Sequence, residues 1–335
     1  MSVDITAEPE LMPTPRPTSA GTRHRALRFP RSPKTLTGLV LLLVFVVAAV
    51  IGPLLAPFDP TATGTDLLAG PSGAHLLGTT QSGQDVLSQL LVGARSTVLI
   101  GFLAGLIATA LAIVIGVTAG YFGGLVDDLL SVLTNVFLVI PGLPLLIVLA
   151  AYLPKDTAAN PLVLALIISF TGWAWGARVL RAQTLSMRRR DYVDSAKLVG
   201  ERWPRVIAAE ILPNLTAIVA SSFVFTVLYA VGTYVALAFL GVVDPSRWSW
   251  GGMLFWAESQ NAPQVGAWWW FLPPGLCIAL LGTSLALLNF GLDEFINPRL
   301  RAAGLSRKAA RAAGLRRRIP FGLTPVIPAG RGGQR

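Results

Sequence analysis

Residues 96–119 read STVLIGFLAGLIATALAIVIGVTA and contain no Asp, Glu, Lys or Arg. A helix of about 20 apolar residues crosses the roughly 30 Å hydrocarbon core of a bilayer, so this stretch is long enough to span a membrane. Five other stretches are similarly apolar and free of charge: residues 36–56, 129–153, 161–177, 215–241 and 268–292.

These runs predict helices, because lipid offers no hydrogen-bond partner to a free peptide group. A membrane β-barrel would instead show alternating segments of about ten residues, whereas these runs are continuous. The chain is 53% hydrophobic and only 13% charged, which excludes an ordinary soluble globular protein. The sequence therefore predicts an all-α polytopic membrane protein with about six transmembrane helices.

Basic residues are concentrated on one side of this topology. Of the 27 Lys and Arg residues, 24 lie in residues 1–35, in residues 178–205 and from 299 onward. The positive-inside rule then places both termini and the 178–205 loop in the cytosol. The net charge of +10 reflects this topology and contact with anionic membrane lipid. The sequence has no basic patch that is interleaved with aromatic residues, so it does not predict nucleic-acid binding.

Composition divides the chain into four parts. We expect a disordered cytosolic tail at 1–35, a first span with an extracytoplasmic segment at 36–92, a transmembrane core at 93–298 and a basic cytosolic tail at 299–335. Within the second part, residues 84–92 have a helical apolar period that predicts a short interfacial helix before the second span.

The cytosolic loop at 188–213 contains signals for a short helix. Asp191 is expected to cap its N-terminus, with Asp194 giving an acidic version of a capping box. Gly200 is expected to end the helix in a left-handed conformation, and Pro204 to begin the next one. The sequence thus predicts a soluble helix that is tethered at both ends to membrane helices.

This short helix has small apolar side chains on part of its surface. Val193, Ala196 and Leu198 are expected to let a partner approach closely, and the flanking charges of Lys197 and Arg202 to fix the register. Local physics alone fits equally an amphipathic helix that lies on the inner leaflet.

A group of motifs resembles one protein family in order and spacing. The 194–213 segment resembles the EAA loop of bacterial ABC importer permeases, with Asp194 and Ser195 in place of Glu and Ala. Further motifs resemble the C-type subunit of the dipeptide, oligopeptide and nickel permeases: residues 75–86 (HLLGTTQSGQDV), 120–124 (GYFGG), 189–193 (RRDYV), 212–214 (LPN), 238–241 (AFLG), 250–251 (WG) and 297–300 (NPRL).

The resemblance implies a type I importer permease fold in the bacterial cytoplasmic membrane. The expected partners are a second permease subunit, two cytosolic ATP-binding subunits and an extracytoplasmic substrate-binding lipoprotein. The EAA helix would couple this chain to an ATPase. The residues expected to form the coupling site are Asp191, Tyr192, Asp194, Ser195, Ala196, Gly200, Leu212 and Pro213.

Four residues are candidates for the transport pathway or its gate. Pro141 and Pro144 interrupt the third span, where they are expected to kink it. Asn135 and Thr233 stand where the resembled family often has Asp and Glu. Without these acids the membrane region is less suited to a cation or metal. Peptides remain the expected cargo, with neutral oligosaccharides as the alternative.

The chain is not expected to be an enzyme or to hold a cofactor. It has no G-x-x-x-x-G-K-[ST] loop for ATP, which would be bound by the partner subunits, and no H-E-x-x-H or G-x-S-x-G motif. A stand-alone channel or secondary transporter would require intramembrane charges or inverted repeats, and neither is visible. An intramembrane enzyme would require clustered acids or histidines.

Overall fold

The computed structural model describes residues 33–296, except 153, 155–159 and 245. Within that range the regular elements are all helical, and the one β contact is an isolated bridge between Thr79 and Asp85. The elements are α1 (Pro33–Leu55), α2 (Val86–Phe122), α3 (Gly124–Val139), α4 (Gly142–Ala151), α6 (Pro161–Met187), α7 (Asp191–Leu198), α8 (Trp203–Arg205), the π-helix η1 (Val206–Ile211), α9 (Leu212–Phe239), α10 (Trp250–Ser259) and α11 (Trp268–Ile296).

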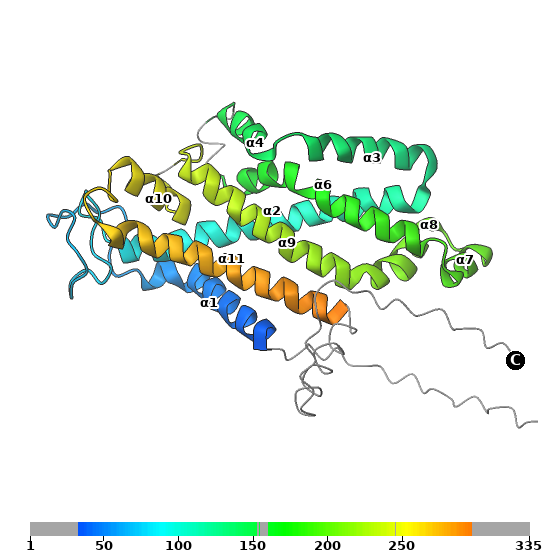
Figure 1. Ribbon diagram of the computed structural model, residues 1–335, viewed down its shortest axis with the longest axis horizontal. Helices are drawn as coiled ribbons and strands as arrows, with labels where there is room; N and C mark the ends of the chain where they lie inside the picture. The colour runs from blue at the N-terminus through cyan, green and yellow to red at the C-terminus, as the bar shows by residue number, and fades with distance from the viewer. Residues whose placement is uncertain (1–32, 153, 155–159, 245, 297–335) are drawn as a thin grey trace, which may run out of the picture.

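The long helices lie side by side in one elongated bundle (Figure 1). The short helices α7 and α8 project at one end, and α10 and the loop before α2 lie at the other. These are called the α7 end and the α10 end below. The tails predicted at 1–35 and 299–335 lie outside the described residues. Residues 33–35 are the exception: they were expected in the disordered tail but begin α1.

Five helices are long and apolar enough to cross a membrane, and the bent pair α3–α4 makes a sixth span if counted as one. This confirms the helical, polytopic prediction. The expected interfacial helix at 84–92 is not separate, because α2 runs unbroken for 37 residues from Val86. Likewise α6 continues past residue 177 to Met187. Loss of apolar character marks where a helix leaves the membrane rather than where it ends.

The third span is broken rather than kinked. Helices α3 and α4 meet at 85° around Ile140 and Pro141. Both residues have extended backbone angles, with ψ of 126° and 111°. The proline ring disfavours a helical conformation at the residue before it, and proline has no N–H to continue the ladder. The chain therefore turns sharply at this point.

Helix α2 is the centre of the bundle and packs most extensively against α6 and α9. Its inward face is lined by small residues such as Ala104, Ala108 and Ala112, all at most 2% exposed. At Gly116 a Cβ would collide with the backbone of Ala177 on α6. Small residues let helix backbones approach closely, which is the usual way that membrane helices gain packing contacts.

A π-helix precedes α9 because of Pro213. Its ring cannot donate a hydrogen bond and would collide with the carbonyl one turn earlier in a regular helix. The wider turn of η1 accommodates it, and Asn214 Nδ2 donates to the carbonyl of Glu210 at 2.6 Å. Helices α8, η1 and α9 together form one continuous span, Trp203–Phe239.

Candidate functional site

The N-cap of α7 lies one residue earlier in the chain than the sequence predicts. Arg190 is the N-cap, and its carbonyl accepts from the amides of Val193 (2.9 Å) and Asp194 (3.1 Å). Asp191 is therefore the first helical residue, and no side chain caps the helix. The predicted Asp191 cap and acidic capping box are wrong. Both carboxylates still lie in the first turn, where they oppose the positive end of the helix dipole.

Asp194 pairs with Lys197 on the exposed side of α7. The Lys197 ammonium lies 3.2 Å from Asp194 Oδ1 and also donates to the carbonyl of Arg188 at 3.2 Å. It lies 5.8 Å from the centre of the Tyr121 ring at the end of α2. Lys197 thus connects α7 to the ends of α6 and α2.

The C-terminus of α7 is closed as the sequence predicted. Gly200 has a φ of +89°, its N–H donates to the carbonyl of Lys197, and the N–H of Glu201 donates to that of Ala196. These two bonds form a Schellman motif. No atom lies within 4 Å of where a Cβ at Gly200 would stand, so the backbone conformation and not crowding requires glycine. Pro204 lies in the first turn of α8, also as predicted.

The apolar surface of α7 is divided differently from the prediction. Val193 is fully buried in a cluster with Val117, Val206 and Leu215, and Ala196 packs against this cluster. Leu198 is 88% exposed and Val199 84% exposed. The prediction that Val193, Ala196 and Leu198 together contact a partner is therefore wrong for Val193. Its buried side chain instead fixes α7 to the bundle. Two adjacent apolar side chains at the tip face outward instead.

A groove of about 540 Å³ lies between α7 and the α8–η1 segment. It brings together three candidate residues, Tyr192, Ser195 and Ala196, with Val199. On its other side are Glu201, Arg205, Val206 and Glu210. Glu201 and Arg205 form an ion pair of 2.8 Å. The sequence had not singled out Arg205, which follows Glu201 by one helical turn.

Leu212 and Pro213 do not line this groove. Leu212 packs against the buried cluster that holds Val193, and Pro213 lies in the first turn of α9. Leu212 and Pro213 lie at the N-terminal end of α9, where they set the direction in which the α7 segment joins this membrane helix. Asp191, Asp194 and Gly200 also lie outside the groove, on or at the end of α7.

A second groove, of about 200 Å³, lies beside the break in the third span. It is lined by Phe137, Leu138, Ile140 and Gly142 of the α3–α4 pair, Thr171, Gly172 and Trp175 of α6, and Phe225, Thr226 and Tyr229 of α9. The hydroxyls of Thr171 and Tyr229 lie 3.3 Å apart across it. None of the lining side chains is charged.

The four pathway candidates are not gathered in that groove. Pro141 lies between two of its lining residues, and Pro144 is in the first turn of α4. The Asn135 side chain accepts a hydrogen bond from Arg178 at 3.4 Å, and Thr233 is 7% exposed in the helix interface. Nothing in the sequence singles out Thr171 and Tyr229, because their hydroxyls lie on two different helices and come together only when α6 packs beside α9.

The described part of the chain holds no group of three His, Cys, Asp or Glu side chains placed to bind a metal. An ion pair with two hydrogen bonds links Asp127 of α3 to Arg181 of α6. Arg181 Nη2 donates to Asp127 Oδ2 at 2.8 Å, and its Nε donates to Oδ1. This pair lies at the α7 end and closes the turn between α2 and α3 onto α6.

Comparison with known proteins agrees with this architecture. Residues 112–302 match the family described as binding-protein-dependent transport system inner membrane component. Residues 23–71 match the N-terminal transmembrane domain of oligopeptide transport permease C.

Named relatives cover most of the chain. The dipeptide transport system permease protein of Haemophilus influenzae is 32% identical over 82% of this chain and 93% of its own length. The corresponding protein of Bacillus subtilis is 31% identical over 85% and 88%. The oligopeptide transport system permease protein of Mycobacterium tuberculosis is 30% identical over 82% and 94%. The chain belongs to the family of inner membrane components of binding-protein-dependent transport systems.

Proposed function

We propose that this chain is one of two permease subunits of an ATP-driven importer that carries dipeptides or oligopeptides. The names of its relatives support the cargo class. The absence of charge around the groove beside α3 and α4 is compatible with the uncharged backbone of a peptide. Neutral oligosaccharides, the alternative cargo, fit the same observation, and uptake assays separate the two.

The observation that carries the proposal is the form of α7. It is a short helix anchored by one buried residue, Val193, and ended by Gly200, with Leu198 and Val199 exposed at its tip. Exposed neighbouring apolar side chains on a rigid turn are suited to contact with another protein. In the proposed assembly an ATPase subunit receives this tip, and ATP-driven movement of that subunit rocks the bundle.

The other partners and the orientation belong to the same proposal. ATP is hydrolysed on the two cytosolic subunits, so this chain needs neither a catalytic residue nor a cofactor. Its α7 end faces the cytosol with both termini, which the eight basic residues of 178–205 support. The α10 end faces the extracytoplasmic binding protein. Apolar residues exposed along α3, such as Leu125 and Val139, contact lipid or the second permease.

The test compares two glycines that have the same backbone requirement. Gly200 and Gly124 have φ of +89° and +54°, and neither has an atom within 4 Å of a Cβ position. Valine is strained at both positions. Gly200→Val distorts the end of α7, so peptide uptake by cells that hold the whole transporter should fall at least tenfold. Gly124→Val carries similar strain outside α7 and should retain most uptake.

Immunoblots of the membrane fraction establish that both variants are present in equal amount. Equal uptake by Gly200→Val and the unchanged chain would overturn the coupling role of α7. Uptake of oligosaccharide in place of peptide by the unchanged transporter would overturn the cargo class alone.

A further inference from the structure

A third hollow, lined by polar and aromatic side chains, lies at the α10 end, which is the opposite end of the bundle from α7 (Figure 1). Its volume is about 300 Å³. Gln89 enters it from the first turn of α2, Trp256 and Gln260 from the end of α10, and Trp270 from the first turn of α11. Trp248 comes from the loop between α9 and α10. Two stretches distant in sequence, residues 61–89 and 246–270, therefore converge on one site, which is called the tryptophan pocket.

Three polar atoms of the side chains lining this pocket are buried without a hydrogen-bond partner. They are Gln89 Oε1, Trp248 Nε1 and Trp270 Nε1. Gln89 is 1% exposed and Trp270 is 3% exposed. Buried polar groups are nearly always paired, because leaving one unpaired costs its hydration. Three such atoms on side chains that line one hollow favour a ligand site at this position.

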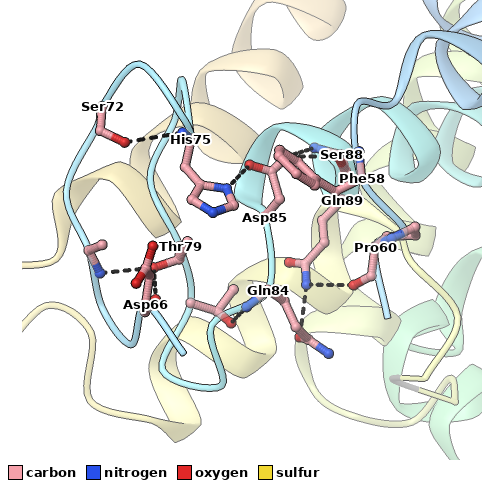
Figure 2. A network of polar contacts seen from close by, with 12 residues as sticks. Phe58, Pro60, Asp66, Ser72, His75, Thr79, Gln84, Asp85, Ser88 and Gln89 are labelled. Carbon is pink, nitrogen blue, oxygen red and sulfur yellow. Dashed lines mark hydrogen bonds and ion pairs between the residues drawn. The ribbon is translucent and has the colours of Figure 1, made fainter. Parts of the chain in front are cut away.

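The amide of Gln89 is held in one orientation. Its Nε2 donates to the carbonyl of Pro60 at 3.3 Å and to Oε1 of Gln84 at 2.9 Å, as Figure 2 shows. Because the nitrogen is engaged twice, the free atom is the acceptor Oε1. The side chains that line the pocket thus carry one unpaired acceptor and two unpaired indole donors.

A hydrogen-bonded loop supports this arrangement. Asp85 caps α2 by accepting from the amide of Ser88 at 2.8 Å, and its other oxygen lies 2.9 Å from His75 Nδ1 (Figure 2). On the α11 side, Trp269 Nε1 donates to the carbonyl of Thr79 at 3.2 Å. The loop that carries Gln84 is therefore hydrogen-bonded to both α2 and α11 before any ligand arrives, which lowers the entropic cost of binding.

The chemistry of the lining limits the ligand. Of the ten residues, three are Trp, three are Gln and four carry hydroxyls, so none is charged. Indole rings provide flat apolar contact together with an N–H donor. A peptide unit presents a carbonyl that accepts from two donors and an N–H that pairs with an amide oxygen. An uncharged backbone segment therefore complements two indole N–H groups and Gln89 Oε1.

We propose that the tryptophan pocket binds an uncharged backbone segment of a peptide at the outer end of the bundle. The choice of peptide rests on the proposed function, whereas the existence of the site rests on its own geometry. A site here would hold cargo on this chain before it reaches the groove beside α3 and α4.

The test uses the full chain in lipid nanodiscs and saturation-transfer NMR, which detects weak ligands directly. The probe is N-acetyl-triglycine amide, which has peptide units and no charge, and maltotriose is the second probe. We expect saturable binding of the peptide. Gln89→Leu and Trp270→Phe should each weaken it about tenfold by removing one hydrogen bond in a buried site. Trp268→Phe is the matched control, since Trp268 is 52% exposed and does not line the pocket.

Each outcome has a distinct meaning. Peptide binding that only the two pocket variants weaken supports the proposal. Trp248→Phe, which removes the other unpaired N–H, replaces either variant that fails to fold. Absence of peptide binding in a chain whose complete transporter imports peptides would overturn the site and leave the proposed function standing. Binding of maltotriose alone, with no peptide uptake by cells, would overturn both.

Discussion

Arg181 and Arg188, on the same face of α6 near its end, use their guanidinium groups in different ways. Arg181 holds Asp127 of α3 with two donors, whereas Arg188 donates to the carbonyls of Gly120 and Tyr121 at 3.3 and 3.4 Å. The turn between α2 and α3 is therefore held by one ion pair from Arg181 and by two hydrogen bonds from Arg188 to backbone carbonyls. Arginine is suited to both, because its planar group presents several donors at fixed angles.

The ionic contact can be tested by a neutral substitution. Asp127→Asn should lower the free energy of unfolding by about 1–2 kcal/mol, because Arg181 keeps its charge and loses a charged acceptor. The effect is limited because the Arg181 side chain remains 34% exposed to solvent. Asp128→Asn, at the exposed neighbouring carboxylate, should change stability by less than about 0.5 kcal/mol. Thermal unfolding of the purified chains measures both, and equal effects would contradict the assigned ion pair.

Among the helices, α2 decides the packing of the bundle through its small residues. Gly101 and Gly105 lie against Val231 and Val227 of α9, and Gly116 lies against the backbone of α6. A methyl group can displace a side chain more easily than a backbone. The contact at Gly116 is therefore the least tolerant of the three.

A pair of glycine substitutions with opposite expectations tests this packing. Gly116→Ala should destabilise the chain by about 1–3 kcal/mol, because α2 and α6 must move apart to admit the methyl group. Gly232→Ala on α9 should cause no loss, since no atom lies within 4 Å of its Cβ position. Detergent-induced unfolding monitored by circular dichroism distinguishes them. A tolerated Gly116→Ala would mean that α2 and α6 are not in close contact.

At the scale of the whole molecule, the two ends differ in what they offer. The α7 end has a short helix with an apolar tip and a groove lined by both acidic and basic side chains. The α10 end has a loop held by a polar network and a pocket lined by tryptophan and glutamine. Between them, the helices expose apolar side chains to the bilayer or to other subunits. This polarity fits a protein that contacts different partners on the two sides of a membrane.

The proposed orientation predicts which end is accessible from outside the cell. Gln81→Cys, in the exposed loop at the α10 end, should react with a membrane-impermeant maleimide in intact cells. Leu198→Cys at the tip of α7 should react only after the cells are permeabilised. The unchanged chain, with its single Cys277, supplies the background. Labelling of Leu198→Cys from outside would reverse the assigned topology.

The number and type of spans could be predicted from the sequence. A helix that crosses a bilayer must be long and apolar, so each one appears in the sequence as an uninterrupted stretch of apolar residues. The Gly200 turn was equally local, since few residues other than glycine adopt its backbone angles. The coupling-loop residues and pathway candidates remain predictions as functional assignments.

Only the tertiary structure decided what meets across helices. Val193 was expected to face a partner but packs against Val206 and Leu215, because burial depends on neighbours that no local pattern names. The angle of 85° between α3 and α4 at Pro141 could not be predicted, because it depends on the backbone positions of both helices. The tryptophan pocket is built from side chains as far apart in the sequence as Thr61 and Trp270, so nothing in any one segment marks it. Local conformation is set by neighbours along the chain, whereas a binding site is set by neighbours in space.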